Sequence, residues 1–144
     1  LAVASGDQMV VIARIEPPDD LGFVVRVGHR LPLSRSTSGA VLFAFQSDEV
    51  REHWLALMDA AGTLQKRKRF IAHADEIRTQ GYVMQPSGDV DAVTDLSAPI
   101  LRRGSAAGAL TIPYVERKPV EVPIKIALER LRAAVDGISK DLTA

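Results

Sequence analysis

A single carboxylate interrupts a stretch of sequence that is otherwise typical of a buried β-strand. The stretch is AVTDLSAPI, Ala92 to Ile100, and the carboxylate is Asp95. Burying an unpaired carboxylate costs several kcal/mol, so such a side chain is normally exposed, paired, or directed into a wet cavity. Because alternate residues of a strand share a face, Val93, Asp95 and Ser97 are expected on one side of this strand.

Hydroxyl side chains in two other segments could meet that face. The segment SRSTSG, Ser34 to Gly39, precedes the apolar run AVLFAF and predicts a helix that begins near Thr37 or Ser38. A helix start offers backbone N–H groups and a partial positive charge, which suit a carboxylate ligand. In the later stretch GALTIPYV, Thr111 would join Asp95 and Ser97 if the two strands pair through LRRGSAAG. These residues predict a polar patch that binds a small molecule.

The elements that would position this patch alternate between strands and helices. LAVAS and MVVIARIE, separated by Gly6-Asp7-Gln8, predict a hairpin, and GFVVRVGHRLPL predicts a third strand with Phe23, Val25 and Val27 on one face. Helices are predicted over 48–61, from a cap at Thr63 to Gly81, and from near Pro123 onwards. The pattern indicates an α+β fold, an antiparallel sheet flanked by three or four helices.

Composition excludes several kinds of chemistry. The 144 residues carry equal numbers of basic and acidic side chains, include no cysteine, and are 47% hydrophobic, which fits one globular domain. Disulfides, thiolate metal sites and cysteine nucleophiles are therefore absent, and bulk charge does not favour nucleic acid. No apolar run approaches a membrane span, so we expect a soluble, cytoplasmic protein.

Motifs for catalysis, cofactors and metals are also missing from the sequence. The histidines His29, His53 and His73 lie on three different segments without helical pairing, and no glycine-rich nucleotide fingerprint occurs. The STSGA segment offers a serine neither a neighbouring histidine nor a nucleophile elbow. We therefore expect no catalytic residues, no metal and no cofactor.

Two segments of the chain, in their order along the sequence, resemble a known protein family. They are VRVGHRLPLSRSTSGAVLFAF and IRTQGYVMQPSGDVDAVTDLSAPILRRGSAAGALTIPYV, which together are similar to the C-terminal effector-binding domain of IclR-family bacterial transcriptional regulators. The shared elements are Gly28, Pro32, Leu33, Ser36, Gly39, Arg78, Gly81, Tyr82, Ala98, Pro99, Ile100, Ala109, Leu110 and Thr111. The chain departs from the family where many members have Cys in place of Asp95, and where a Lys often stands in place of Ala40.

The resemblance implies a GAF-like fold and a single effector-sensing domain over residues 1–144. It also implies self-association to a dimer or tetramer, and DNA binding only through an N-terminal winged helix-turn-helix domain that this chain lacks. The ligand-binding residues it implies, together with those reasoned from the sequence, are Thr37, Ser38, Gly39, Asp95, Ser97, Thr111, Phe23 and Val93.

Because Asp95 would repel a second carboxylate, we expect an effector that carries a hydroxyl, phenol or amino group as well as its acid. Three alternatives stay open from the sequence. Asp95 could accept hydrogen bonds from residues 37–39 as a purely structural group, or act as the general base of a small-molecule enzyme. The domain could also serve only for oligomerisation.

Overall fold

A computed structural model describes residues 1–16, 25–58, 62–88 and 90–144. In these ranges six strands form one antiparallel sheet in the order β3-β2-β1-β6-β5-β4. The strands are β1 (Ala2–Ser5), β2 (Gln8–Val11), β3 (Arg30–Pro32), β4 (Val83–Pro86), β5 (Thr94–Arg102) and β6 (Ser105–Tyr114). The helices are the 3-10 helix η1 (Leu33–Arg35), α1 (Thr37–Ala44), α2 (Asp48–Met58), α3 (Leu64–Gln80) and α4 (Ile124–Thr143). The predicted α+β architecture is confirmed.

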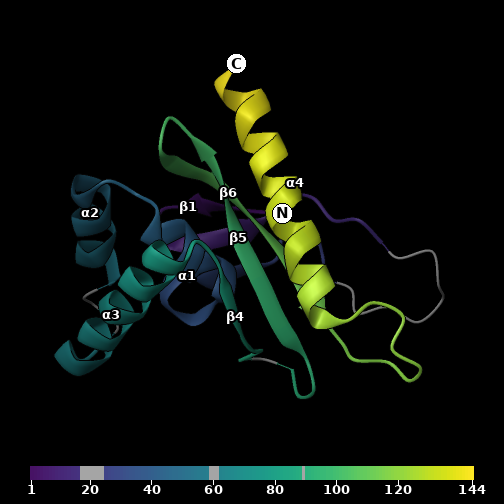
Figure 1. The fold of residues 1–144 in the computed structure, drawn as a ribbon. Helices are drawn as coiled ribbons and strands as arrows, with labels where there is room; N and C mark the ends of the chain where they lie inside the picture. Colours follow the sequence, from purple (N-terminus) through teal and green to yellow (C-terminus); the bar gives the residue numbers. More distant parts are fainter. Residues whose placement is uncertain (17–24, 59–61, 89) are drawn as a thin grey trace.

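The helices cover the two faces of the sheet unequally. In Figure 1, α4 lies along one face of β5 and β6, while α1 lies on the other side with α2 and α3 outside it. Strand alternation separates two cores accordingly. Leu96, Ala98 and Ile100 of β5 pack with Leu131 and Val135 of α4. The larger core is built around α1 and includes residues of β1, β2, α3 and β4.

The sequence placed most helix boundaries correctly. The side chain of Thr63 caps α3 by accepting from the amide of Lys66, and Gly81 ends that helix at φ +86°. The last helix begins directly after Pro123. Leu64, the first residue of α3, is 69% exposed. No helix among the described residues is both long and apolar enough to cross a lipid bilayer.

The predicted third strand is mostly wrong. Among its described residues, 25–33, only Arg30–Pro32 form a strand paired with β2, and Val27 and Gly28 form a turn in which Gly28 has a φ of +88°. Val27 is 58% exposed, because the turn breaks the alternation on which the prediction depended. Phe23 lies outside the described residues.

The connection between β5 and β6 is shorter than the sequence suggested. Most of LRRGSAAG is strand, and the chain reverses at Arg103 and Gly104, both at positive φ. The register then aligns Ser97 with Thr111 and Asp95 with Pro113. This pairing fixes the polar face of the sheet beneath α1.

Candidate functional site

The start of α1 is held by its own capping residue. The side-chain oxygen of Ser36 accepts from the amide of Gly39 at 3.0 Å, and the carbonyl of Ser36 accepts from Ala40 at 3.0 Å. The amides of Thr37 and Ser38 stand in the first turn, where a helix provides no acceptor of its own. No acidic side chain occupies this turn. The helix start therefore keeps its positive polarity for another acceptor.

Gly39 lets α1 approach η1 closely. A Cβ atom at this position would lie 2.4 Å from the carbonyl oxygen of Leu33 and 2.6 Å from its Cα. Both are backbone atoms, so no side-chain rotation could relieve the contact. The role of Gly39 is consequently to place Thr37 and Ser38 against the sheet.

Asp95 is paired with the helix start. The hydroxyl of Thr37 donates to Oδ2 of Asp95 at 2.9 Å, and Nε2 of Gln85 donates to the same Thr37 oxygen at 3.2 Å. Gln85 is also the direct cross-strand neighbour of Asp95 in the pairing of β4 with β5. The hydrogen bond that we considered as the structural alternative for Asp95 thus exists.

A second set of hydroxyls lies beside the first. The side-chain oxygen of Thr111 is 2.9 Å from that of Ser38 and 2.8 Å from that of Ser97. Ser97 is fully buried, and Thr111 is its cross-strand partner. The predicted convergence of Asp95, Ser97 and Thr111 near residues 37 and 38 is therefore present in the structure.

A cavity of about 1230 Å³ opens beside these groups. Thr37, Ser38, Asp95 and Thr111 line it. Asp95 is therefore both paired and directed to a cavity, two of the three situations that permit a carboxylate within a strand. Apolar walls come mainly from the first two strands and β6, and include Ala2, Met9, Val11, Leu31, Leu110 and Ile112.

Positive charge exceeds negative charge around the cavity. Among its described lining residues are four arginines, Arg14, Arg35, Arg117 and Arg130, and two carboxylates, Glu16 and Asp95. Arg14 is paired with Glu16. This excess favours an anionic ligand over a cationic one.

The other predicted site residues lie elsewhere. Gly39, Ser97 and Val93 are buried but are not among the described residues that line the cavity. Val93 precedes β5, and its carbonyl accepts from the amide of Ser87 at 2.8 Å. Phe23 falls outside the described ranges.

Sequence reasoning missed Gln85. The strand VMQP is short, ends at Pro86 and follows directly on Gly81 and Tyr82, so it carries little strand signal. A polar residue between two apolar ones in such a segment was the available hint. Gln85 can be linked to the site only when the pairing of β4 with β5, which places it opposite Asp95, is known.

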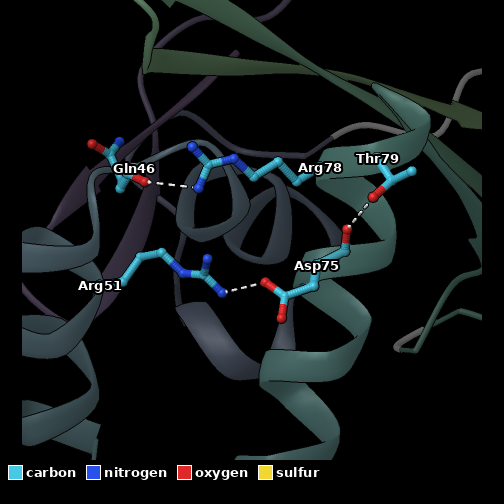
Figure 2. Close-up of polar contacts among 5 residues, drawn as sticks. All are labelled: Gln46, Arg51, Asp75, Arg78 and Thr79. Atoms are coloured by element: carbon cyan, nitrogen blue, oxygen red, sulfur yellow. Dashed lines mark hydrogen bonds and ion pairs between the residues drawn. The ribbon is translucent and has the colours of Figure 1, made fainter.

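The far side of α1 is anchored by α2 and α3. The ring of Phe43 lies 4.8 Å from the ring of Phe70, and the guanidinium of Arg51 lies 4.8 Å from the centre of the Phe43 ring. Arg51 also pairs with Asp75 at 2.6 Å (Figure 2). These contacts close α1 between the sheet and α3.

The C-terminal end of α1 is tied to the β5–β6 hairpin. The carbonyl of Phe45 accepts from the amide of Ala106 at 2.9 Å, and the side chain of Gln46 donates to the carbonyl of Ala106 at 2.8 Å. Arg78 donates to the carbonyl of Gln46 at 3.5 Å (Figure 2). Both ends of α1 are thus fixed, and its first turn is presented to the cavity.

The residues that the structure describes contain no group of three histidine, cysteine, aspartate or glutamate side chains that could hold a metal ion. Every buried polar side-chain atom in the same residues has a hydrogen-bond partner. The arrangement places hydrogen-bonding side chains and an excess of positively charged side chains around one cavity.

Comparison with known proteins gives one family and one fold. The family model for the C-terminal region of the bacterial transcriptional regulator IclR matches residues 1–140. No curated protein sequence matches the chain significantly.

An IclR homologue from Microbacterium hydrocarbonoxydans, solved with 4-hydroxybenzoate, is 26% identical to this chain, with a TM-score of 0.75. The match covers 98% of this chain and 58% of that protein.

Two further solved structures share the fold. The IclR of Thermotoga maritima has a TM-score of 0.77 at 21% identity, with 99% of this chain and 60% of that protein covered. A double mutant of the inducer-binding domain of PobR from Acinetobacter, solved with 3-hydroxybenzoic acid, has a TM-score of 0.71 at 19% identity, covering 99% and 85%. The chain therefore spans about three fifths of the Microbacterium and Thermotoga proteins.

Proposed function

Because the chain belongs to the IclR family of bacterial transcriptional regulators, as the C-terminal domain, we propose that it senses a small organic effector. The family resemblance drawn from the sequence is confirmed, and the family consists of regulators rather than enzymes. One observation is the main support for the proposal. Two hydrogen-bonded pairs, Thr37 with Asp95 and Ser38 with Thr111, lie together on the wall of one cavity.

The proposed effector is a small carboxylate that also carries a hydroxyl, phenol or amino group. Its carboxylate would lie at the first-turn amides of α1, near Thr37 and Ser38, where the helix polarity and the surrounding arginines favour an anion. Its hydroxyl or amino group would donate to Asp95, and Thr111 would contribute a further contact. Similar proteins bound to 4-hydroxybenzoate and 3-hydroxybenzoic acid support this class of ligand.

Ligand titration tests the proposal directly. Calorimetry with 3-hydroxybenzoate and 4-hydroxybenzoate should detect binding to the wild-type protein, and benzoate, which lacks the donor, should bind more weakly. The variant D95N should bind the hydroxy acids less tightly and benzoate more tightly, because it removes the charge that repels a carboxylate. Equal preference in wild type and D95N would return Asp95 to a purely structural role.

We also propose that the domain acts as part of a larger cytoplasmic regulator. In this proposal it self-associates to a dimer or tetramer, and DNA is bound by an N-terminal winged helix-turn-helix domain outside these residues. The balanced charge of the chain supports the absence of DNA affinity in this part. Sedimentation should show a dimer or tetramer, whereas micromolar duplex binding at about 0.15 M salt would contradict the proposal.

A further inference from the structure

We propose that Gln85, which lies outside the lining of the cavity, determines which hydrogen-bonding groups the Asp95 end of the cavity offers to a ligand. The Thr37 hydroxyl stands between the two side chains, accepting from Gln85 at 3.2 Å and donating to Asp95 at 2.9 Å. Gln85 is thus a positioning residue that acts through Thr37. The inference rests on the proposed function, since it concerns selectivity for the ligand of that cavity.

The direction of this hydrogen-bond chain follows from the chemistry of its members. A carboxylate only accepts, and a threonine hydroxyl has a single hydrogen to donate. Because that hydrogen goes to Asp95, the Gln85 group beside the Thr37 oxygen has to be the amide NH₂ rather than the carbonyl. The hydrogen bonds therefore point in one direction: Gln85 donates to Thr37, and Thr37 donates to Asp95.

This direction makes the Asp95 end of the cavity an acceptor. Thr37 is 7% exposed and its hydrogen is already used, so it has no hydrogen left for a ligand acceptor. A carboxylate offers about four acceptor positions, so Asp95 can receive a ligand hydroxyl in addition to Thr37. The ligand has to bring the donor.

Replacing Asp95 with asparagine would make the influence of Gln85 measurable. In D95N the side chain at position 95 can donate as well as accept, and we expect Gln85 to keep its donating orientation, so that Thr37 donates to the amide oxygen of the new side chain. The amide NH₂ at position 95 then faces the cavity. The site would offer a donor where the wild type offers an acceptor, and the selectivity for a ligand hydroxyl should be lost.

Exchanging the two side chains should restore part of that selectivity. In D95N/Q85E the carboxylate at position 85 accepts the Thr37 hydrogen, and the Thr37 oxygen accepts from the NH₂ group at position 95. The amide oxygen at position 95 is then turned to the cavity. The double variant keeps the side-chain shapes and the net charge of the wild type, because a carboxylate and a carboxamide have only changed places.

The test is the ratio of benzoate Kd to 3-hydroxybenzoate Kd, measured by calorimetry. D95N should lower this ratio about tenfold, the usual worth of one hydrogen bond to a charged group. D95N/Q85E should raise the ratio about threefold or more above that of D95N, without reaching the wild-type value, because a neutral amide oxygen accepts a weaker hydrogen bond than a carboxylate. The matched control D95N/Q65E places the same charge on an exposed residue of α3 and should leave the ratio as low as in D95N.

Two further variants test whether the side chain at position 85 affects position 95 through the Thr37 hydroxyl. Adding T37V to D95N/Q85E removes the hydroxyl and should abolish the recovery. D95N/Q85M removes the competing donor without adding a carboxylate, and should recover part of the ratio even if the exchanged variant folds poorly.

The possible failures are distinguishable. If the wild type binds both probes but neither D95N/Q85E nor D95N/Q85M recovers the ratio, Gln85 has no role in selectivity, and the proposed function stands. Recovery in D95N/Q65E would assign the effect to charge alone and also overturn the inference. If the wild type binds neither hydroxybenzoate nor benzoate, the proposed function fails and this inference fails with it.

Discussion

Helices α1 and α4 pack on opposite faces of β5 and β6 but bury very different fractions of their residues. All eight residues of α1 are buried, whereas only Ala127, Leu131 and Val135 of the twenty residues of α4 are buried. A helix like α4 needs one apolar stripe, and its sequence shows that stripe clearly. A helix like α1 needs partners for every polar group, which is why Thr37 and Ser38 are hydrogen-bonded to residues of β5 and β6.

The difference teaches where binding sites arise in this fold. Polar side chains buried at one end of α1 force complementary polar side chains onto the strands, and the cavity lies where the two sets meet. The residues of β5 that α4 covers are apolar and pack with it, and α4 also contributes Arg130, Leu131, Ala134 and Ile138 to the lining of the cavity. Changes at the first turn of α1 should therefore affect both stability and binding, and changes to α4 residues outside the described cavity lining should affect stability alone.

The largest expected effect is the loss of Phe43. This ring is fully buried and contacts Phe70 and Arg51, so F43A should reduce the free energy of unfolding by about 3–5 kcal/mol. On α4, L142A removes a side chain that is 45% exposed and should change stability by less than about 0.5 kcal/mol. Urea denaturation measures both, and similar losses would erase the contrast between the helices.

A matched pair of glycines should respond with opposite signs. G39A would bring a Cβ atom to 2.4 Å from the Leu33 carbonyl oxygen and should cost about 3 kcal/mol. G137A in α4 meets nothing within 4 Å and should gain about 1 kcal/mol from higher helix propensity. Thermal unfolding of the two variants measures both changes in stability. A G39A variant as stable as the wild type would show that α1 can move away from η1.

The next effect concerns binding at the start of α1. S38P removes one first-turn amide while a helix start still tolerates proline, and should weaken 3-hydroxybenzoate binding about tenfold beyond the effect of S38A. S38A is the control, because it loses the hydroxyl contact to Thr111 but keeps the amide. If calorimetry gives the same Kd for both variants, the carboxylate is bound at another place.

The smallest expected effect is on a hydrogen bond between α4 and the β5–β6 hairpin. The side-chain oxygen of Ser139 accepts from the amide of Leu101 at 2.8 Å, where the pairing of β5 with β6 shifts register. S139A leaves that amide without its acceptor and should cost about 1 kcal/mol with unchanged ligand affinity. A change in Kd would mean that Ser139 influences the cavity although it is not among its described lining residues.

The sequence predicted the site where local chemistry was decisive. Ser36 and its neighbours read as a cap because hydroxyl side chains satisfy helix amides, and the alternation around Asp95 gave the correct face of β5. The partners of these residues depended on register, and the pairing of Ser97 with Thr111 was foreseeable only because the two strands are adjacent in sequence.

Longer-range features escaped prediction for physical reasons. The apolar residues near Val27 imitate a strand, but the turn at Gly28 interrupts them, and nothing in the composition distinguishes the two cases. Gln85 gains its meaning only from the neighbouring strand, since no local pattern links it to Thr37, 48 residues earlier. The lining arginines come from separate segments and meet only in the folded chain.

The complete burial of α1 also bears on how such domains could diversify. A helix with no exposed position tolerates few substitutions, so new ligand preferences would be acquired more readily through the strands that face it. Under the proposed function, exchanges at positions such as 85, 95 and 111 would alter what the cavity recognises while the sequence of α1 stays unchanged. Libraries for new sensors should accordingly hold Thr37–Ala44 constant and randomise the strand residues opposite its first turn.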